Sequence, residues 1–381
     1  MHPSLRCFLD QHDLDGFFFV GDSMSNADMY YLSHFLAGDR FALLLSSRST
    51  LLVSSMEKGR AEKESCADEC LSTSSYRIRE LFSQLGNPGD AYCHVLKDFL
   101  NEHGIRHLGV PFEFPAGIYR SLIRDFSVDI LDSPAAAWRA VKSPFEQKAI
   151  AVTQSACEKA MRRAVQLIAS SEPHGEILHR HGRPLTSEMV RAEIEVSLLE
   201  DGCEAADTIV AGGRQAADPH ARGTGALAAH SPIVIDIFPR DKTSRYFADM
   251  TRTVLRGEAA REVTEIYEAV RTAQDAGLRA IRAGVTGAQV HLQVSEAFND
   301  LGFTEREGQG FTHSTGHGVG LDVHEKPSLG DLGEALLENQ VVTVEPGLYY
   351  PDIGGVRLED LVVVRDSGHE NLTHFERQLV L

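Results

Sequence analysis

The second half of the chain places four carboxylates and one histidine in or beside short apolar segments, and this feature constrains the fold most. The five residues are Asp236 in VIDIF, Asp249 in FADMTRT, His317 in HSTGHGVG, Glu345 in TVEPGLY and Glu359 in GGVRLED. Burying an unpaired carboxylate costs several kcal/mol of free energy. A fold that brings these five side chains together therefore requires a cation. Mn²⁺, Co²⁺ or Zn²⁺ suits such ligands, and two ions suit four carboxylates better than one. We therefore predict a site for two divalent metal ions.

Length, charge and cysteine content argue against several classes of protein. The 381 residues suffice for two domains with buried cores. An excess of acidic residues gives a formal charge of −18, which argues against a nucleic-acid partner. The six cysteines form no CxxC motif, so we expect reduced thiols and a cytoplasmic protein. The polar N-terminus and the short apolar runs FFFV and FALLL predict neither a signal peptide nor a membrane span.

Residues 1–133 alternate short apolar segments with polar, helix-like ones, which predicts an N-terminal α/β domain. Apolar, strand-like segments are expected at 14–20, 30–35, 40–45, 50–54 and 107–113, and helices at 57–70 and 91–103. Cys66 and Cys70 would then share a helix face. A structural role is favoured for them because no histidine or second cysteine pair is near.

Residues 134–145 are interpreted as a linker, and residues 146–381 as the catalytic domain. Ser143, Pro144 and Glu146 are typical of a helix start with a capping box, which predicts a helix over 144–170. Further helices are expected after Thr186, over 258–283 and from Thr286 to Gly302, and β-rich segments at 208–211, 233–238, 246–254, 341–344 and 361–364. Helices segregated from a mostly antiparallel sheet predict an α+β domain.

Asp236 and Asp249 belong to two predicted strands joined by the turn-rich segment PRDKTSR, which favours a hairpin. Facing strands can place two side chains about 5 Å apart on one face, which suits carboxylates that share metal ions. The polar side chains of the following MTRT could hold the Asp249 carboxylate by hydrogen bonds. Alone, such a pair is usually a turn or surface feature, so its meaning depends on the other three residues.

The stretch HSTGHGVGLDVHE holds three histidines, His313, His317 and His324. Glycines on both sides of His317 permit close backbone approach to a ligand, and the grouping favours a functional site. Glu345 ends the apolar strand VVTV, where a carboxylate needs a partner. Arg357 and Glu359 can point to the same face of a strand. His220, in DPHARGT, is a further candidate.

These segments together resemble the pita-bread metallopeptidase family, which includes methionine aminopeptidase, aminopeptidase P, prolidase and creatinase. The resemblance covers nearly the whole chain. NADMYYLSHFLAGDRFALLL is similar to the smaller creatinase-type N-terminal domain of the branch that cleaves Xaa-Pro bonds, and WRAVKSPFEQKAI is similar to its linker and first catalytic helix. The resemblance therefore implies a pita-bread catalytic domain behind that N-terminal domain.

The family pattern implies a ligand set for the two metal ions. Asp249 and Glu359 would bridge the ions. Asp236 would complete the coordination of one ion, and His317 with Glu345 would complete that of the other. Glu345 would also carry a proton from the attacking water to the leaving nitrogen.

The remaining candidates resemble residues that surround the substrate. His313 and His324 are similar to substrate-contacting histidines, with His324 near the tetrahedral oxyanion, and His220 is similar to a further active-site histidine. Arg357 resembles the arginine that supports the last glutamate ligand. By the same analogy we expect a homodimer that acts on short peptides with proline at the second position.

Two departures from the family pattern bear on specificity. The segment between Asp236 and Asp249 is longer than usual, which predicts a longer loop with unchanged ligands. Strict dipeptidases often carry an arginine shortly after HExP. Here HEKP is followed by Ser328, and no arginine lies between Glu325 and Glu345, which favours aminopeptidase action on longer peptides over strict dipeptidase action.

Two alternatives share the fold. A creatinase-type hydrolase would cleave a C–N bond without metal, and a non-catalytic pita-bread module would only bind a partner. Both would have replaced or lost ligands, whereas all five are present here. The sequence therefore favours a dinuclear Xaa-Pro peptidase, with manganese, cobalt or zinc as the ions.

Overall fold

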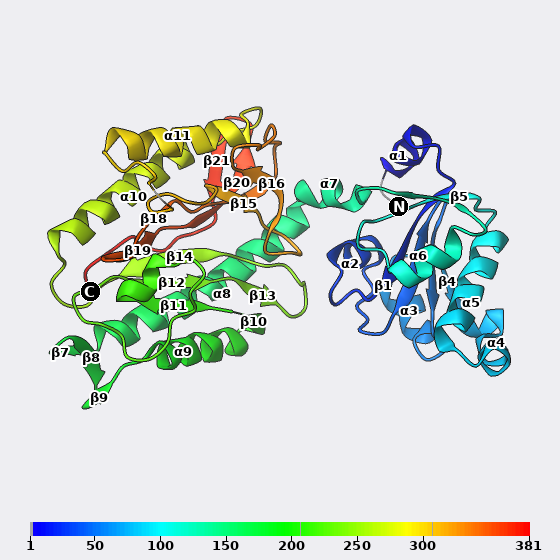
Figure 1. Ribbon diagram of the computed structural model, residues 1–381, viewed down its shortest axis with the longest axis horizontal. Coiled ribbons are helices and arrows are strands. Elements are labelled where there is room, and N and C mark those ends of the chain that lie inside the picture. The colour runs from blue at the N-terminus through cyan, green and yellow to red at the C-terminus, as the bar shows by residue number, and fades with distance from the viewer. Residues whose placement is uncertain (1–2, 206, 307) are drawn as a thin grey trace. The chain divides into compact units, whose positions relative to one another are not determined.

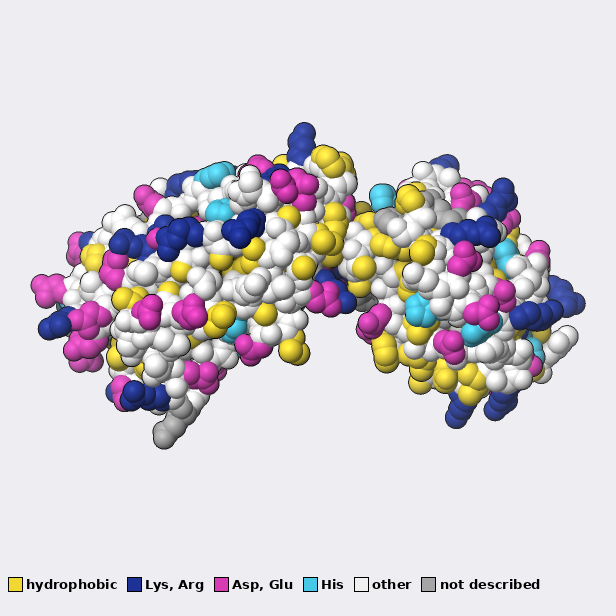
Figure 2. Space-filling view, turned by 90° about the horizontal axis from the view of Figure 1, so that it is seen from above, with side chains coloured by type: hydrophobic (Ala, Val, Ile, Leu, Met, Phe, Trp, Pro, Cys, Tyr) yellow, Lys and Arg dark blue, Asp and Glu magenta, His cyan; other side chains and the backbone are white. Residues whose placement is uncertain are grey.

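The computed structural model describes residues 3–205, 207–306 and 308–381. The chain forms two compact units, Met1–Arg139 and Ala140–Leu381, whose elements are labelled in Figure 1. None of the described helices is both long and apolar enough to cross a bilayer. Acidic and basic side chains are interspersed over the face of the molecule seen in Figure 2.

The first unit is built on a mixed sheet with strand order β4-β3-β2-β1-β5-β6. The strands are β1 (Gly16–Gly21), β2 (Phe41–Leu45), β3 (Ser49–Val53), β4 (Glu69–Ser72), β5 (His107–Val110) and β6 (Ser127–Ile130). Both faces are buried, because Phe18 packs into one apolar cluster and its neighbours Phe17 and Phe19 pack into another. The segment FFFV is apolar throughout for this reason.

Helices cover both faces of this sheet. The cluster around Phe18 is closed by α4 (Ile78–Leu85), α5 (Pro88–Glu102) and α6 (Ala116–Leu122). The opposite cluster contains residues of α1 (Leu5–Gln11), α2 (Ala27–Ser33) and α3 (Lys58–Glu64). A 3₁₀ turn, η1 (Thr73–Tyr76), follows β4, and α7 (Pro134–Ala140) ends the unit.

Two predictions in this unit were wrong. The segment 30–35 was expected to be strand-like, but Ala27–Ser33 is helical because the Asn26 side chain caps the helix by accepting from the Met29 N–H. The helix predicted over 57–70 ends at Glu64, and the chain then pairs as β4 with β3 at the sheet edge. Cys66 and Cys70 therefore do not share a helix face.

The helices of the second unit form two packed pairs, α8 (Pro144–Ala169) with α9 (Ser187–Glu200) and α10 (Arg261–Ala280) with α11 (Gly287–Asp300). The capping boxes predicted at Ser143 and Thr286 are confirmed, with Glu146 and Gln289 closing them. In Figure 1 the strands that carry the site lie between the two helix pairs. Each pair packs its apolar face into a separate core cluster on its own side of the strands.

The strands of this unit pair antiparallel and form several small sheets. One has the order β11-β12-β14 and another the order β16-β15-β17-β20-β21. Their members are β11 (Ile209–Gly212), β12 (Ile233–Ile237), β14 (Met250–Val254), β15 (Gly316–Gly318), β16 (Glu325–Leu329), β17 (Val341–Val344), β20 (Asp360–Arg365) and β21 (Gly368–Asn371). Two short hairpin-like pairings join β10 (Cys203–Ala205) to β13 (Pro239–Asp241) and β18 (Gly347–Tyr350) to β19 (Gly354–Arg357). In a third small sheet β8 (Ile177–Arg180) lies between β7 (Glu172–His174) and β9 (Arg183–Pro184). A 3₁₀ turn, η2 (Gly213–Ala217), follows β11. The predicted α+β class is confirmed.

Candidate metal centre

Antiparallel pairing of β12 with β14 brings the two aspartates together. Asp236 in β12 lies opposite Thr251 in β14, and Asp249 precedes β14 by one residue. Asp249 and Thr251 are two residues apart, so their side chains point to the same face. Both carboxylates are buried, and Asp249 is only 4% exposed. The predicted hairpin-like juxtaposition thus exists, with β13 inserted into the connection.

The neighbouring sheet supplies the other three side chains. His317 lies in β15, Glu345 follows β17, and Glu359 precedes β20. Gly316 is required beside His317, because a Cβ at this position would lie 2.1 Å from the backbone oxygen of Thr343. The Thr343 hydroxyl accepts the His317 backbone N–H at 3.0 Å and donates to Glu345 Oε1 at 3.2 Å. Close strand packing therefore fixes the histidine and the glutamate relative to each other.

All five side chains line one cavity of about 600 Å³, a volume typical of small-molecule sites. Asp249, His317 and Glu359 each offer a ligand atom within 4.8 Å of the others. His317 Nε2 lies 3.2 Å from Glu345 Oε1 and 3.8 Å from Asp249 Oδ2. His220, His313, His324 and Arg357 line the same cavity. The structure thus brings together every residue that the sequence singled out for the site.

The carboxylates repel one another in this cavity. Burial, reinforced by the charges of the neighbouring carboxylates, holds the pKa of both Asp249 and Glu359 well above the usual range. Burial also raises the pKa of Asp236, although the positive charge of Arg357 opposes it. Burial would raise the pKa of Glu345 as well, but the hydrogen bond from His317 dominates and lowers this pKa to about 2. The site therefore favours protons or cations between its carboxylates.

One oxygen of Asp236 indicates that the site holds a metal cation rather than only protons. Asp236 Oδ2 accepts from Arg357 Nη2 at 2.7 Å, but the buried Oδ1 has no hydrogen-bond partner among the described residues. A buried acceptor without a donor is rare and requires an explanation. Metal coordination supplies one, because a carboxylate oxygen close to further carboxylates and an imidazole is a hard-cation ligand.

Sequence comparison identifies the family to which the chain belongs. The family profile described as "Metallopeptidase family M24" matches residues 147–366, and the one described as "Creatinase/Prolidase N-terminal domain" matches residues 2–140. The Xaa-Pro dipeptidase of Pyrococcus horikoshii is 30% identical to this chain over 386 residues, covering 98% of the chain and 96% of that protein. The chain belongs to metallopeptidase family M24.

Solved structures agree with this M24 assignment. The prolidase from Pyrococcus horikoshii OT3 superposes with a TM-score of 0.81 and 26% identity, covering 99% of this chain and 98% of that one. The X-Pro aminopeptidase from Thermotoga maritima superposes with a TM-score of 0.79 and 28% identity, covering 97% of this chain and 98% of that one. Both similarities extend over the two units of the chain.

Two contacts around the candidate metal ligands differ from the sequence prediction. The residues after Asp249 were expected to hold its carboxylate, but the Thr251 hydroxyl donates instead to Glu359 Oε2 at 2.8 Å. Arg357 was expected to support Glu359, but its guanidinium contacts Asp236 directly and reaches Glu359 only through Thr251, which accepts from Arg357 Nε at 3.1 Å. The reason is the strand register, which sets Thr251 between the two residues.

Sequence reasoning missed Tyr349 in this site. Its hydroxyl lies 2.9 Å from Arg357 Nη1 and 3.0 Å from His313 Nε2, and burial raises the pKa of Tyr349 to about 12. The spacing could have indicated it, because Glu345, Gly347 and Tyr349 are two residues apart and in an extended chain point to the same face. The ring centroids of two other residues of the cavity, His317 and His324, lie 4.2 Å apart.

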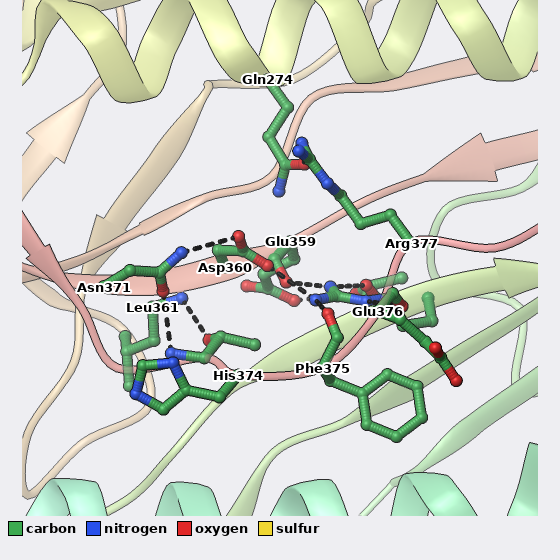
Figure 3. Close-up of polar contacts among 12 residues, drawn as sticks. Gln274, Glu359, Asp360, Leu361, Asn371, His374, Phe375, Glu376 and Arg377 are labelled. Carbon is green, nitrogen blue, oxygen red and sulfur yellow. Dashed lines mark hydrogen bonds and ion pairs between the residues drawn. The ribbon is translucent and has the colours of Figure 1, made fainter.

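Arg252 was also missed, and it joins the strands that carry the ligands. Its buried guanidinium donates to the backbone carbonyls of Thr251 and Glu359 at 2.9 and 2.6 Å. It also pairs with Asp360 Oδ1 at 2.8 Å. Figure 3 shows Asp360 between Asn371 and the C-terminal segment 374–377, which lies against the same strands. Arg252 therefore connects the segment 374–377 to the strands that carry the candidate metal ligands.

Proposed function

We propose that this chain hydrolyses the peptide bond between an N-terminal residue and proline, using two divalent metal ions. The observation that carries the proposal is the convergence of four buried or half-buried carboxylates and His317 on one cavity. Relatives that align over almost the whole chain support the substrate class, since they include Xaa-Pro dipeptidases of two Pyrococcus species. Proline is a distinctive substrate because its tertiary amide lacks an N–H and fixes φ.

The donor set fits two ions. Asp249 and Glu359 would be shared by the two ions, since each offers a ligand atom within 4.8 Å of the other and of His317. Asp236 would contribute to one ion through Oδ1, which has no hydrogen-bond partner among the described residues. His317 and Glu345, whose Nε2 and Oε1 lie 3.2 Å apart, would contribute to the other. Bound divalent ions would polarise the scissile carbonyl and lower the pKa of an attacking water. Manganese, cobalt and zinc all suit these oxygen and nitrogen ligands.

The protein side chains then handle the proton and the substrate. Glu345 is ionised at neutral pH, because its pKa is about 2, so it can accept a proton from water and donate it to the leaving nitrogen. Burial lowers the pKa of His313 and His324, so both imidazoles are neutral. The Nδ1–H of His313 donates to the Ser314 carbonyl and its Nε2 faces the Tyr349 hydroxyl, so His324 rather than His313 can donate a hydrogen bond to a substrate oxygen. Tyr349 and Arg357 hold His313 and Asp236 in place.

The alternatives from the sequence have less support. A metal-independent creatinase-type hydrolase and a binding module would each leave the clustered carboxylates without a neutralising partner, which burial disfavours. We also retain the proposals that the protein is a cytoplasmic homodimer, that its N-terminal domain spans 1–133, and that its physiological ion is manganese.

The decisive experiment combines metal analysis with turnover. Protein purified without chelator should contain close to two Mn, Co or Zn ions per chain and should cleave an Xaa-Pro peptide. Asp249→Ala removes a bridging ligand, so it should abolish turnover and lower metal content. Asp331→Ala is the matched control, because this carboxylate is 93% exposed and lies outside the cavity. The proposal would be overturned if protein stripped of metal by a chelator still cleaved the peptide, or if Asp249→Ala showed normal turnover.

A further inference from the structure

A buried ion pair in the second unit, between Lys142 and Glu325, has no part in the proposed metal site. The Lys142 side chain is 1% exposed and the Glu325 side chain 7% exposed, and Nζ donates to Oε1. Taking both charges out of water costs about as much as their attraction returns, so stability alone is a weak reason for such a pair. Neither residue lines the cavity, but Glu325 directly follows His324, which does.

Lys142 is held firmly at its backbone. Its N–H donates to the Asn339 carbonyl at 2.9 Å, and its own carbonyl accepts from Gln147 Nε2 at 2.9 Å. The preceding residue, Val141, forms an isolated β-bridge with Gln340. Residues 339 and 340 lead directly into β17. The ammonium group of Lys142 therefore extends from a backbone that is attached to the start of a core strand.

Glu325 begins β16 at a point where the pairing of this strand is irregular. Gly318 pairs with Glu325 and His317 pairs with Ser328, so two residues of β16 have no partner in β15. Such a bulge interrupts the ladder of backbone hydrogen bonds that would otherwise fix the strand. The Glu325 carboxylate packs against Gly320, where a Cβ would lie 2.2 Å from Oε1. Side-chain contacts of Glu325 therefore hold the start of β16 where the ladder does not.

The imidazole of His324 makes no hydrogen bond to the residues that the structure describes. Its ring packs on that of His317, with centroids 4.2 Å apart. The direction of the His324 side chain therefore depends on its backbone. His324 and Glu325 share one peptide group, and because this group is planar, fixing Glu325 restricts the orientation of His324.

We propose that Lys142 is a positioning residue, which through Glu325 holds the His324 imidazole in place for the substrate. This inference rests on the proposed function, because it assigns a support to one of the side chains that would contact the peptide. Lys142 itself touches neither the cavity nor the candidate metal ligands. Its loss should therefore affect turnover only through His324.

The test is a double-mutant cycle between Lys142 and His324. Lys142→Met removes the ammonium group and keeps an unbranched side chain. In Mn²⁺-loaded protein it should lower kcat for an Xaa-Pro-Xaa tripeptide about 10- to 100-fold, because a displaced donor loses most of its effect in the transition state, and should change KM less than about threefold. In the His324→Ala background the same substitution should change kcat less than about twofold. Lys159→Met is the matched control, since Lys159 pairs with Asp201 but is 47% exposed, and its kcat should equal that of wild type.

Two further variants separate positioning from stability. Lys142→Met leaves a buried carboxylate without this partner and should lower Tm. The double variant Lys142→Met/Glu325→Gln leaves neither charge, so Tm should recover while kcat stays low. Recovery of kcat together with Tm would show that the pair only stabilises the fold and would overturn the inference. Gly320→Ala displaces the same carboxylate without removing a charge, so it should reproduce the loss of kcat.

The His324 imidazole can also be observed without turnover. Zn²⁺-loaded protein is labelled with carbon-13 at histidine Cε1, and the His324 resonance is identified by its absence from His324→Ala. Lys142→Met should shift this resonance, and Lys159→Met should not. A shift in a protein that cleaves no Xaa-Pro peptide would disprove the proposed hydrolysis alone. An unshifted resonance in folded Lys142→Met, or a kcat equal to that of wild type, would disprove the positioning role.

Discussion

The substitution Arg252→Met tests the packing that holds the proposed metal ligands in place. The Arg252 side chain is 2% exposed and donates five hydrogen bonds, to the carbonyls of Thr251, Glu359, Phe375 and Glu376 and to Asp360 Oδ1. Methionine fills much of the same volume but supplies no charge and no donor. Of its side-chain partners among the described residues, Asp360 would keep the Asn371 amide, which donates to Oδ2 at 3.0 Å.

The expected loss follows from leaving that carboxylate buried. Removing one partner of a buried ion pair costs about 3–5 kcal/mol, which is a large share of the roughly 5–15 kcal/mol that stabilises a typical domain. We expect Arg252→Met to lower the free energy of unfolding by that amount. Because Arg252 also joins the carbonyl of Thr251, two residues after Asp249, to the carbonyl of Glu359, metal affinity should fall with stability.

The assay is urea unfolding of metal-free protein, followed by circular dichroism, for wild type, Arg252→Met, Asp360→Asn and the double variant. In the double variant no charge is left unpaired, so its loss should be smaller than the sum of the single losses by at least about 1 kcal/mol. Hydrogen exchange should show the loss in β14 and β20. The reasoning is refuted if Arg252→Met unfolds within about 1 kcal/mol of wild type, or if the single losses simply add.

Three further predictions concern the site itself. Gly316→Ala should lower stability and metal content, because the new Cβ would lie 2.1 Å from the Thr343 oxygen, whereas Gly117→Ala meets nothing within 4 Å and should be neutral in the same thermal and metal assays. His324→Ala should lower kcat far more than metal content, because we assign His324 to the substrate. A variant that lost its metal but kept normal turnover per bound ion would instead make His324 a metal ligand. The raised pKa of Asp249 and Glu359 means that the metal-free fold holds protons that the unfolded chain releases, so its stability should fall as pH rises through those pKa values. Metal displaces these protons, so the gap in Tm between Mn²⁺-loaded and metal-free protein should widen from about pH 5 to about pH 8, and a constant gap would contradict this.

The helices of the catalytic unit were the most predictable part of the chain. Ser143 with Glu146 and Thr286 with Gln289 are local caps, and local hydrogen bonds depend only on neighbouring residues. The segment 57–70 failed for the opposite reason. Its last residues join an edge strand through pairing with Ser49–Val53, and that non-local contact overrides helical propensity.

For the proposed metal ligands too, one part was predictable from the sequence and another was not. Their chemistry was readable because four carboxylates in apolar surroundings require a cation wherever the chain takes them. Their supports were not readable. Thr251 holds Glu359 rather than the adjacent Asp249, and Tyr349 lies between Arg357 and His313, because strand register decides which side chains meet across a cavity.

Residue type and short-range spacing were thus enough to identify the kinds of groups in the site and the helices that frame it. How those groups are held follows from the tertiary structure. The burial of Arg252 against Glu359 and the position of Asp236 opposite Thr251 arise from contacts between residues far apart in the chain. Such contacts depend on how strands and loops pack, and no local pattern records them.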